Sequence, residues 1–127
     1  MYLVYILQCD NLTYVGMTND FFKRWQQHNQ ILSGGAKYTK KGCEWYPICI
    51  LDGFISKSEA MQCEWKLKHN RNYKGPSKRV EYAHLMIQKE VWTSKSPKIK
   101  DQHLQVYIDN EYQHIFSNYP TKELYWK

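Results

Sequence analysis

The chain has 127 residues, of which 43% are hydrophobic and 16% aromatic, enough for one domain with a substantial core but too few for two. No apolar run approaches the roughly 18 residues of a membrane-spanning helix, so we expect no membrane association. The N-terminal stretch lacks the basic segment of a secretory signal, and we therefore expect an intracellular protein of the nucleus, the cytoplasm or a viral factory.

Positive charge is concentrated in the first part of the chain. Residues 1–100 contain 16 Lys and Arg against 8 Asp and Glu, a balance of +8, and residues 101–127 contain 2 against 4, a balance of −2, which together give the formal +6. A basic surface favours a polyanionic partner such as DNA. The four cysteines, at positions 9, 43, 49 and 63, show no C-x-x-C spacing, so we expect free, mostly buried thiols in a reducing compartment rather than a zinc site.

Residues 4–18 are typical of a β-hairpin, because the runs VYIL and TYVG flank a turn-prone CDN triplet. With the turn centred on residues 10–11, Tyr5 lies opposite Gly16. Tyr14 then projects from the same face as Tyr5, as a diagonal neighbour. A shift of one residue in the register would place the two tyrosines on opposite faces.

A helix is predicted after the hairpin, capped by Thr18 or Asn19. Arg24 and His28 in this helix are spaced i and i+4 and therefore project from the same side. Two tyrosines, an arginine and a histidine within 26 residues form a set capable of phosphodiester cleavage.

Residues 33–44, SGGAKYTKKGCE, form a glycine-punctuated loop or short helix beside that first helix. Lys37, Lys40 and Lys41 are candidates for contacts with backbone phosphates. The ring of Tyr38 is a candidate for stacking on an unpaired base. A solvated loop without a ligand is the alternative interpretation.

The run WYPICILDGF predicts a third strand, and Ser56 begins a helix that continues to Asn70. Ser56 and Glu59 have the spacing of a capping box. The expected buried stripe of this helix consists of Ala60, Cys63 and Leu67. Glu64 lies beside the stripe and should point toward the edge of the sheet.

The motifs VYI at 4–6 and YVG at 14–16, followed by T-x-x-x-x-x-R-x-x-x-H-N from Thr18 to Asn29, resemble the GIY-YIG endonuclease superfamily. Val4 stands where the first motif usually has glycine. The resemblance implies an α/β (α+β) fold with a small three-stranded mixed or antiparallel sheet flanked by helices. It also implies metal-dependent hydrolysis of DNA phosphodiester bonds.

The resemblance implies a role for each of five catalytic residues. Glu64 would hold one Mg2+ ion, with Mn2+ as the alternative. Arg24 would clamp the non-bridging phosphate oxygens. Tyr5 would be the general base, helped by neighbouring positive charge because a free tyrosine has a pKa of about 10. Tyr14 would orient the water or Tyr5, and His28 would receive the proton; the roles of the two tyrosines can be exchanged.

A narrower similarity connects the chain to Slx-type structure-specific endonuclease catalytic subunits. It rests on GF-x-S-x-x-x-A-x-x-x-E-W from Gly53 to Trp65 and on GGA at 34–36, and it extends over about residues 3–108. Those subunits carry a C-terminal zinc-binding RING-like module that is held by a scaffold protein. This sequence lacks such a cysteine pattern, so a scaffold is not among the expected partners. The many aromatic residues are compatible with a homodimer.

We expect a nuclease core at residues 1–75 and, at residues 76–127, an extension packed on the same domain. A helix is predicted from Lys78 to about Trp92, followed by a polar linker and a C-terminal hairpin formed by LQVYI and YQHIF. No added DNA-reading domain is visible. The sequence therefore predicts a structure-specific enzyme for branched or flapped DNA in repair or recombination. A catalytically silent nucleic-acid-binding module and a GIY-YIG nuclease of other specificity are the alternatives.

Overall fold

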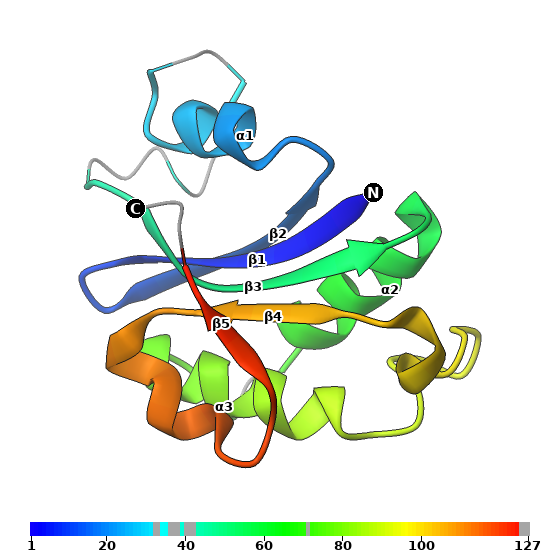
Figure 1. Ribbon diagram of the computed structural model, residues 1–127. Coiled ribbons are helices and arrows are strands. Elements are labelled where there is room, and N and C mark those ends of the chain that lie inside the picture. Colours follow the sequence, from blue (N-terminus) through cyan, green and yellow to red (C-terminus); the bar gives the residue numbers. More distant parts are fainter. Residues whose placement is uncertain (32–33, 36–38, 40–42, 71, 125–127) are drawn as a thin grey trace.

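The structure, a computed structural model, describes residues 1–124 apart from 32–33, 36–38, 40–42 and 71. Its strands are β1 (Tyr2–Cys9), β2 (Leu12–Thr18), β3 (Tyr46–Phe54), β4 (Gln105–Ile108) and β5 (Thr121–Glu123). Its α-helices are α1 (Phe21–His28), α2 (Lys57–Lys68) and α3 (Pro76–Ile87), and two 3-10 helices are η2 (Ile99–Gln102) and η3 (Asn110–Phe116). The helix α1 lies on one side of the sheet, and α2 and α3 lie on the other (Figure 1).

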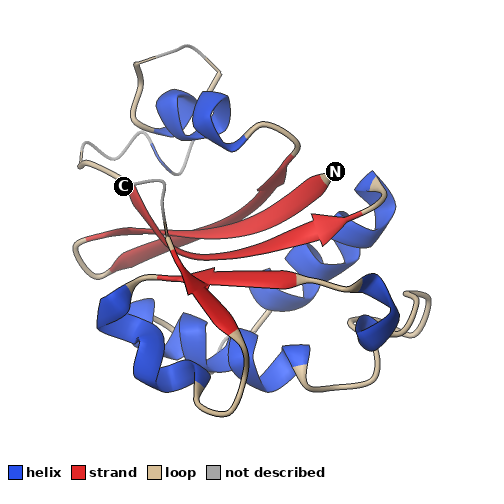
Figure 2. Ribbon diagram, in the orientation of Figure 1, coloured by secondary structure: helices blue, strands red, loops and turns tan. Residues whose placement is uncertain are grey.

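The described strands form one mixed sheet in the order β2-β1-β3-β4-β5 (Figure 2). The pairs β1–β2, β1–β3 and β3–β4 are antiparallel, and β4–β5 is parallel. The expected α/β class is confirmed, but the sheet has five strands rather than three. The two added strands are short and come from the C-terminal part of the chain. No helix among the described residues is long and apolar enough to cross a bilayer.

The N-terminal hairpin has the predicted register. Tyr5 pairs with Gly16, and Leu7 pairs with Tyr14. Asp10 adopts a positive φ of 52° in the turn, a conformation that Asp tolerates better than most residues. The rings of Tyr5 and Tyr14 therefore share one face, with their centroids 6.3 Å apart.

Side chains of β1 alternate between two apolar clusters, as the pleat of a strand requires. The cluster on the α1 side contains the buried residues Leu3, Tyr5, Leu7, Cys9, Phe21, Trp45, Ile50 and Leu124. The larger cluster, which contains Val4 and Ile6, packs against α2 and α3. Val4 and Ile6, the residues on either side of Tyr5, are buried in the larger cluster, and this holds the Tyr5 backbone in place.

The predicted helices are present with small shifts at their ends. Asp20, and not Thr18 or Asn19, caps α1, because its carboxylate accepts the Lys23 N–H at 3.2 Å. The capping box of α2 is confirmed, since Ser56 Oγ accepts the Glu59 N–H at 3.2 Å and donates to the Glu59 carboxylate at 2.8 Å. The predicted stripe of Ala60, Cys63 and Leu67 is buried. The third helix begins at Pro76 and ends at Ile87, before Trp92.

The predicted C-terminal hairpin is wrong. LQVYI contributes β4, but YQHIF lies in the 3-10 helix η3. Asp109 begins this helix by accepting the Glu111 N–H at 3.0 Å, and the Tyr112 hydroxyl donates to Gln8 Oε1 at 2.8 Å. These local and long-range hydrogen bonds favour a helical turn over a returning strand.

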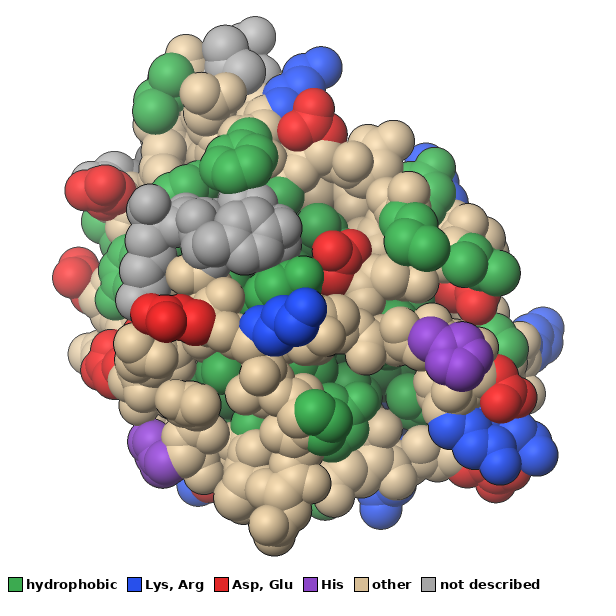
Figure 3. Space-filling model, viewed as in Figure 1, with side chains coloured by type: hydrophobic (Ala, Val, Ile, Leu, Met, Phe, Trp, Pro, Cys, Tyr) green, Lys and Arg blue, Asp and Glu red, His purple; other side chains and the backbone are tan. Residues whose placement is uncertain are grey.

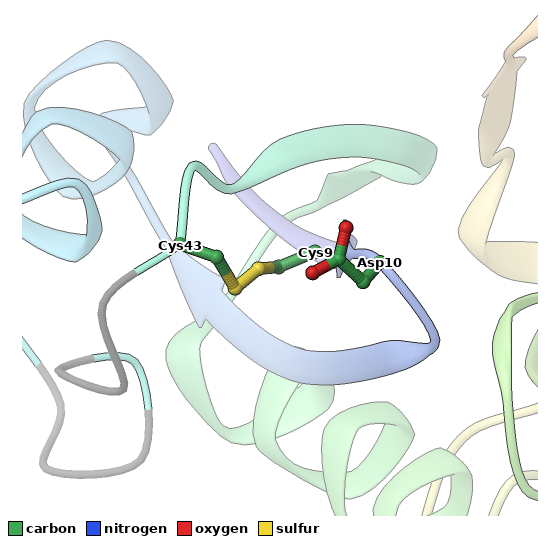
Figure 4. Close-up of side chains that lie close together, drawn as sticks. All are labelled: Cys9, Asp10 and Cys43. Atoms are coloured by element: carbon green, nitrogen blue, oxygen red, sulfur yellow. A yellow bond between two sulfur atoms is a disulfide. The ribbon is translucent and has the colours of Figure 1, made fainter.

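The expectation of four free thiols is wrong for two of them. Cys9, at the end of β1, and Cys43 form a disulfide with a Cα–Cα distance of 6.0 Å, and the Asp10 carboxylate lies beside it (Figure 4). Cys49 and Cys63 are free and buried, as expected. Burial raises the pKa of the Cys49 thiol to about 12, so this thiol is an inert core residue.

Candidate active site

The Tyr5 hydroxyl lies at the centre of the site, inside the α1-side cluster. The side chain is 1% exposed, and its oxygen is 2.7 Å from His28 Nε2. Burial raises the pKa of Tyr5 well above its usual value, and electrostatic interactions with Tyr14 and Glu64 raise it further. Hydrogen bonding and positive charge from Arg24 act in the opposite direction. The positive charge expected beside a tyrosine base is thus present, but it lowers the pKa of Tyr5 by less than burial raises it. Tyr5 is therefore protonated near neutral pH.

His28 connects Tyr5 to the loop that follows α1. Its imidazole is fully buried, and Nδ1 lies 2.9 Å from Thr39 Oγ1. Burial lowers the pKa of His28 to about 4, and the positive charges of Arg24 and Lys68 contribute to the same shift. The ring is therefore neutral near pH 7. In the neutral tautomer that carries its proton on Nδ1, the ring accepts from the Tyr5 hydroxyl at Nε2 and donates to Thr39 Oγ1.

Tyr14 occupies the more open side of the site. It is half-buried, and its ring centroid is 4.8 Å from that of His28. The ammonium of Lys68, at the C-terminal end of α2, lies 4.9 Å from the centre of the Tyr14 ring. A cation at this distance interacts favourably with the ring face. Tyr14 is consequently held between a neutral imidazole and a positive charge.

Arg24 is positioned by the loop as well as by its helix. One guanidinium nitrogen donates to Gln27 Oε1 at 2.9 Å and to the Gly34 carbonyl at 2.7 Å. These two acceptors fix the side chain while the guanidinium still acts on Tyr5. A fixed guanidinium beside a neutral His–Tyr pair is suited to hold an anion such as a phosphate.

Glu64 approaches the site from α2, which packs against β1 and β2. Its carboxylate is half-buried and close enough to Tyr5 to affect the pKa of that residue. Among the described residues, Glu64 belongs to no group of three or more side chains with metal-ligand spacing. One carboxylate fits Mg2+ or Mn2+, because Mg2+ keeps several waters and takes its other ligands from substrate phosphates. It does not fit Zn2+, which prefers three or four protein ligands.

A set of hydrogen bonds around Trp45 holds the end of the loop against α1. The Trp45 N–H donates to Asn29 Oδ1 at 2.6 Å, and its carbonyl accepts from Asn29 Nδ2 at 2.8 Å and from Trp25 Nε1 at 2.6 Å. The indole N–H of Trp45 donates to the Thr39 carbonyl at 3.0 Å. Trp45 therefore positions Thr39, and through Thr39 it positions His28.

Of the five residues predicted from the sequence, Tyr5, Tyr14 and His28 are in direct contact. Arg24 and Glu64 lie near enough to shift the pKa of Tyr5. The predicted DNA contacts at Lys37, Tyr38, Lys40 and Lys41 lie outside the described residues. Two residues that contact the site, Lys68 and Thr39, were not predicted from the sequence. Lys68 follows Glu64 by four residues on α2, a spacing that could have identified it. Thr39 lies in a loop without periodicity, and no sequence signal indicates it.

Comparison with known proteins adds an independent observation. The model of the GIY-YIG catalytic domain matches residues 1–79, which contain the whole site. The chain is 37% identical over 70 residues to the structure-specific endonuclease subunit slx1 of Talaromyces marneffei, covering 54% of this chain and 18% of that protein. It is 41% identical over 56 residues to slx1 of Schizosaccharomyces japonicus, covering 44% and 20%. A UPF0213 protein of Bacillus velezensis is 43% identical over 65 residues, covering 50% and 63%. The match thus spans about a fifth of the slx1 relatives' length.

Proposed function

Because the chain belongs to the GIY-YIG catalytic domain family, we propose that it is a metal-dependent DNA endonuclease that hydrolyses phosphodiester bonds at branches or flaps, as in repair or recombination. The observation that carries the proposal is the buried hydrogen bond between Tyr5 and His28, with Arg24 acting on the same hydroxyl. A module that only binds nucleic acid has no use for a proton-transfer chain of this kind.

The Tyr5–His28 pair activates the attacking water by a relay. A water proton passes to the Tyr5 oxygen as the Tyr5 proton passes to His28 Nε2, and the water oxygen attacks phosphorus while the bond to the leaving oxygen breaks. The raised pKa of Tyr5 disfavours a free phenolate, and a relay avoids one because Tyr5 ends the step neutral. The negative charge of a bound phosphate raises the pKa of His28 from its low value and so assists the transfer.

Arg24, and Glu64 through a bound divalent ion, stabilise the negative charge of the phosphate. Arg24 binds the non-bridging oxygens, where negative charge develops in the transition state. Glu64 would hold one divalent ion, Mg2+ with Mn2+ as the alternative, which supplies positive charge beside the same oxygens when it is bound. Tyr14, on the open side of the site, orients the water. The proposal therefore gives Tyr5 the relay and Tyr14 the orientation of the water.

The preference for branched DNA is supported by the slx1 relatives, whose names describe structure-specific endonuclease subunits. All five site residues come from one chain, so we propose that cleavage needs no second protein. A GIY-YIG nuclease of other specificity is the competing proposal. It predicts equal cutting of branched and linear DNA.

The test is cleavage by the purified chain of labelled flaps, splayed arms, four-way junctions and linear duplex, with Mg2+, with Mn2+ or with a chelator. We expect cuts near the branch that a chelator abolishes. Arg24→Ala and Glu64→Gln should each lower the single-turnover rate by about 100 to 1,000-fold. Lys23→Ala and Glu90→Gln are matched controls, because both residues are exposed. Wild-type rates in the Arg24 or Glu64 variant would remove that residue from the mechanism.

A further inference from the structure

A second surface feature adjoins the site along the outer edge of β2. A cleft of about 490 Å³ is lined by β2 and the preceding turn, from Asn11 to Val15, and by Lys68, Lys74, Gly75 and Arg79. Tyr14 belongs both to this cleft and to the catalytic group. The cleft therefore begins at the reacting centre and leads away from it.

The cleft lining is unbalanced in charge. Three of its residues are cationic and none is acidic, whereas the face of the molecule in Figure 3 shows acidic, basic and apolar side chains interspersed. Lys68 and Lys74 are exposed, and among the described residues no carboxylate lies within salt-bridge distance of either. Their charges are thus directed to a ligand in the cleft or to solvent.

Arg79 gives the cleft a fixed wall. Its Nε donates to Thr13 Oγ1 at 3.2 Å, and one terminal nitrogen donates to the carbonyl of Leu67 at 2.8 Å. These bonds connect the start of β2 to the end of α2. Lys68, whose ammonium lies over the Tyr14 ring, is also at this end of α2. The two walls of the cleft are consequently held at a set separation before any ligand arrives.

The edge strand supplies further donors. β2 pairs only with β1 in the described sheet, so its other side presents backbone groups toward the cleft. Backbone N–H groups and lysine side chains are the usual partners of phosphate oxygens in protein–DNA contacts. A row of such donors that starts at the reacting centre matches a polyanionic strand better than a compact neutral ligand.

We propose that this cleft binds the phosphodiester backbone of the DNA strand on one flank of the scissile phosphate, with Lys68 nearest the reacting centre and Lys74 further out. The inference rests on the proposed nuclease function and adds a subsite to it. Lys74 acts on binding alone, because among the described residues no salt bridge or cation–π contact joins it to the catalytic group. Lys68 acts on both binding and chemistry, through Tyr14 and through the charge it places near His28.

The first experiment measures binding of a labelled flap substrate without divalent ions at a series of salt concentrations. Lys74→Ala should weaken binding several-fold and reduce the slope of log affinity against log salt by about 0.9, the value for one lost phosphate contact on duplex DNA. The matched control is Lys122→Ala, an exposed lysine on β5 at the opposite edge of the sheet. Equal slopes for the two variants would overturn the proposal.

The second experiment locates the contact relative to the cut. Single-turnover cleavage at saturating protein should be unchanged in Lys74→Ala, while the half-saturating concentration rises. Shortening the DNA on one flank should abolish the difference between wild type and Lys74→Ala, and shortening the other flank should preserve it. A difference that survives both truncations would show diffuse attraction and refute the subsite. Binding is measured without cleavage, so the two proposals can fail separately. If the salt dependence of binding is as expected but the protein never cuts DNA, the subsite stands and the proposed nuclease function is refuted.

Discussion

Gly16 lies directly opposite Tyr5 across the β1–β2 pair, and the Tyr5 hydroxyl occupies the space that a Cβ at position 16 would need. The backbone at Gly16 has no positive φ, so close approach, and not conformational freedom, makes glycine necessary here. The last residue of the YVG motif thus makes room for the side chain of the proposed relay residue, Tyr5.

Gly16→Ala should therefore move Tyr5 away from His28, lower stability by about 1–3 kcal/mol as overpacking does, and abolish most of the cleavage. Thermal melting and single-turnover rates test both effects. In a Tyr5→Phe background the loss of stability should be smaller, because the atom nearest the new Cβ is gone. Normal activity in Gly16→Ala would mean that the position of the Tyr5 hydroxyl does not matter.

Removal of either tyrosine hydroxyl should reduce the cleavage rate, but one removal should affect stability more than the other. Tyr5→Phe leaves the fully buried His28 Nε2 without its partner, which costs about 1–3 kcal/mol. Tyr14 is half-buried rather than fully buried, so water can replace its hydroxyl and Tyr14→Phe should lower the melting temperature less than Tyr5→Phe does. Equal melting temperatures for the two variants, with wild-type cleavage by Tyr5→Phe, would contradict the relay.

Stability should depend on pH through His28. Its pKa is lowered to about 4 in the folded protein from about 6.5 in the unfolded chain. The unfolded state therefore binds the extra proton first, so this contribution is fully present above pH 6.5 and is lost as the pH falls toward 4. The loss amounts to about 3 kcal/mol. Urea unfolding between pH 4 and 7 measures it, and a His28→Gln variant, which cannot titrate at this position, should lack that part of the pH dependence.

The Cys9–Cys43 disulfide should contribute to stability, because it closes a 34-residue separation in the chain. The chain-entropy model gives about 4 kcal/mol for a loop of this length. A reducing agent should lower the melting temperature of the wild type and have no effect on Cys43→Ser. Since Cys43 precedes Trp45 by two residues, the same treatment should weaken the support of Thr39 and slow cleavage. A melting temperature insensitive to the reducing agent would show that the bridge is absent in solution.

The sequence was most informative where structure is local. The register of the hairpin follows from its turn and its alternating pattern, and α2 follows from the Ser56–Glu59 capping box and its buried stripe. Both were predictable because the interacting residues are close in the chain. Thr39 and the disulfide were not, since the sequence between Asn29 and Trp45 has no periodic pattern, and the contacts join Thr39 to His28, 11 residues away, and Cys43 to Cys9, 34 residues away. The pairing of β4 with β3 likewise joins segments more than 50 residues apart, from Asp52–Gln105 to Cys49–Ile108, which no local signal specifies.

That pairing has a practical consequence for dissecting the protein. The family match ends at residue 79, yet β4 covers the side of β3 that faces away from β1, and Val106 and Ile108 are buried in the cluster shared with α2 and α3. A fragment cut at residue 79 would expose an unpaired strand and an apolar surface together, the combination that promotes association between sheet edges. Such a fragment is expected to aggregate when it is expressed alone, even though it contains every residue of the proposed catalytic site.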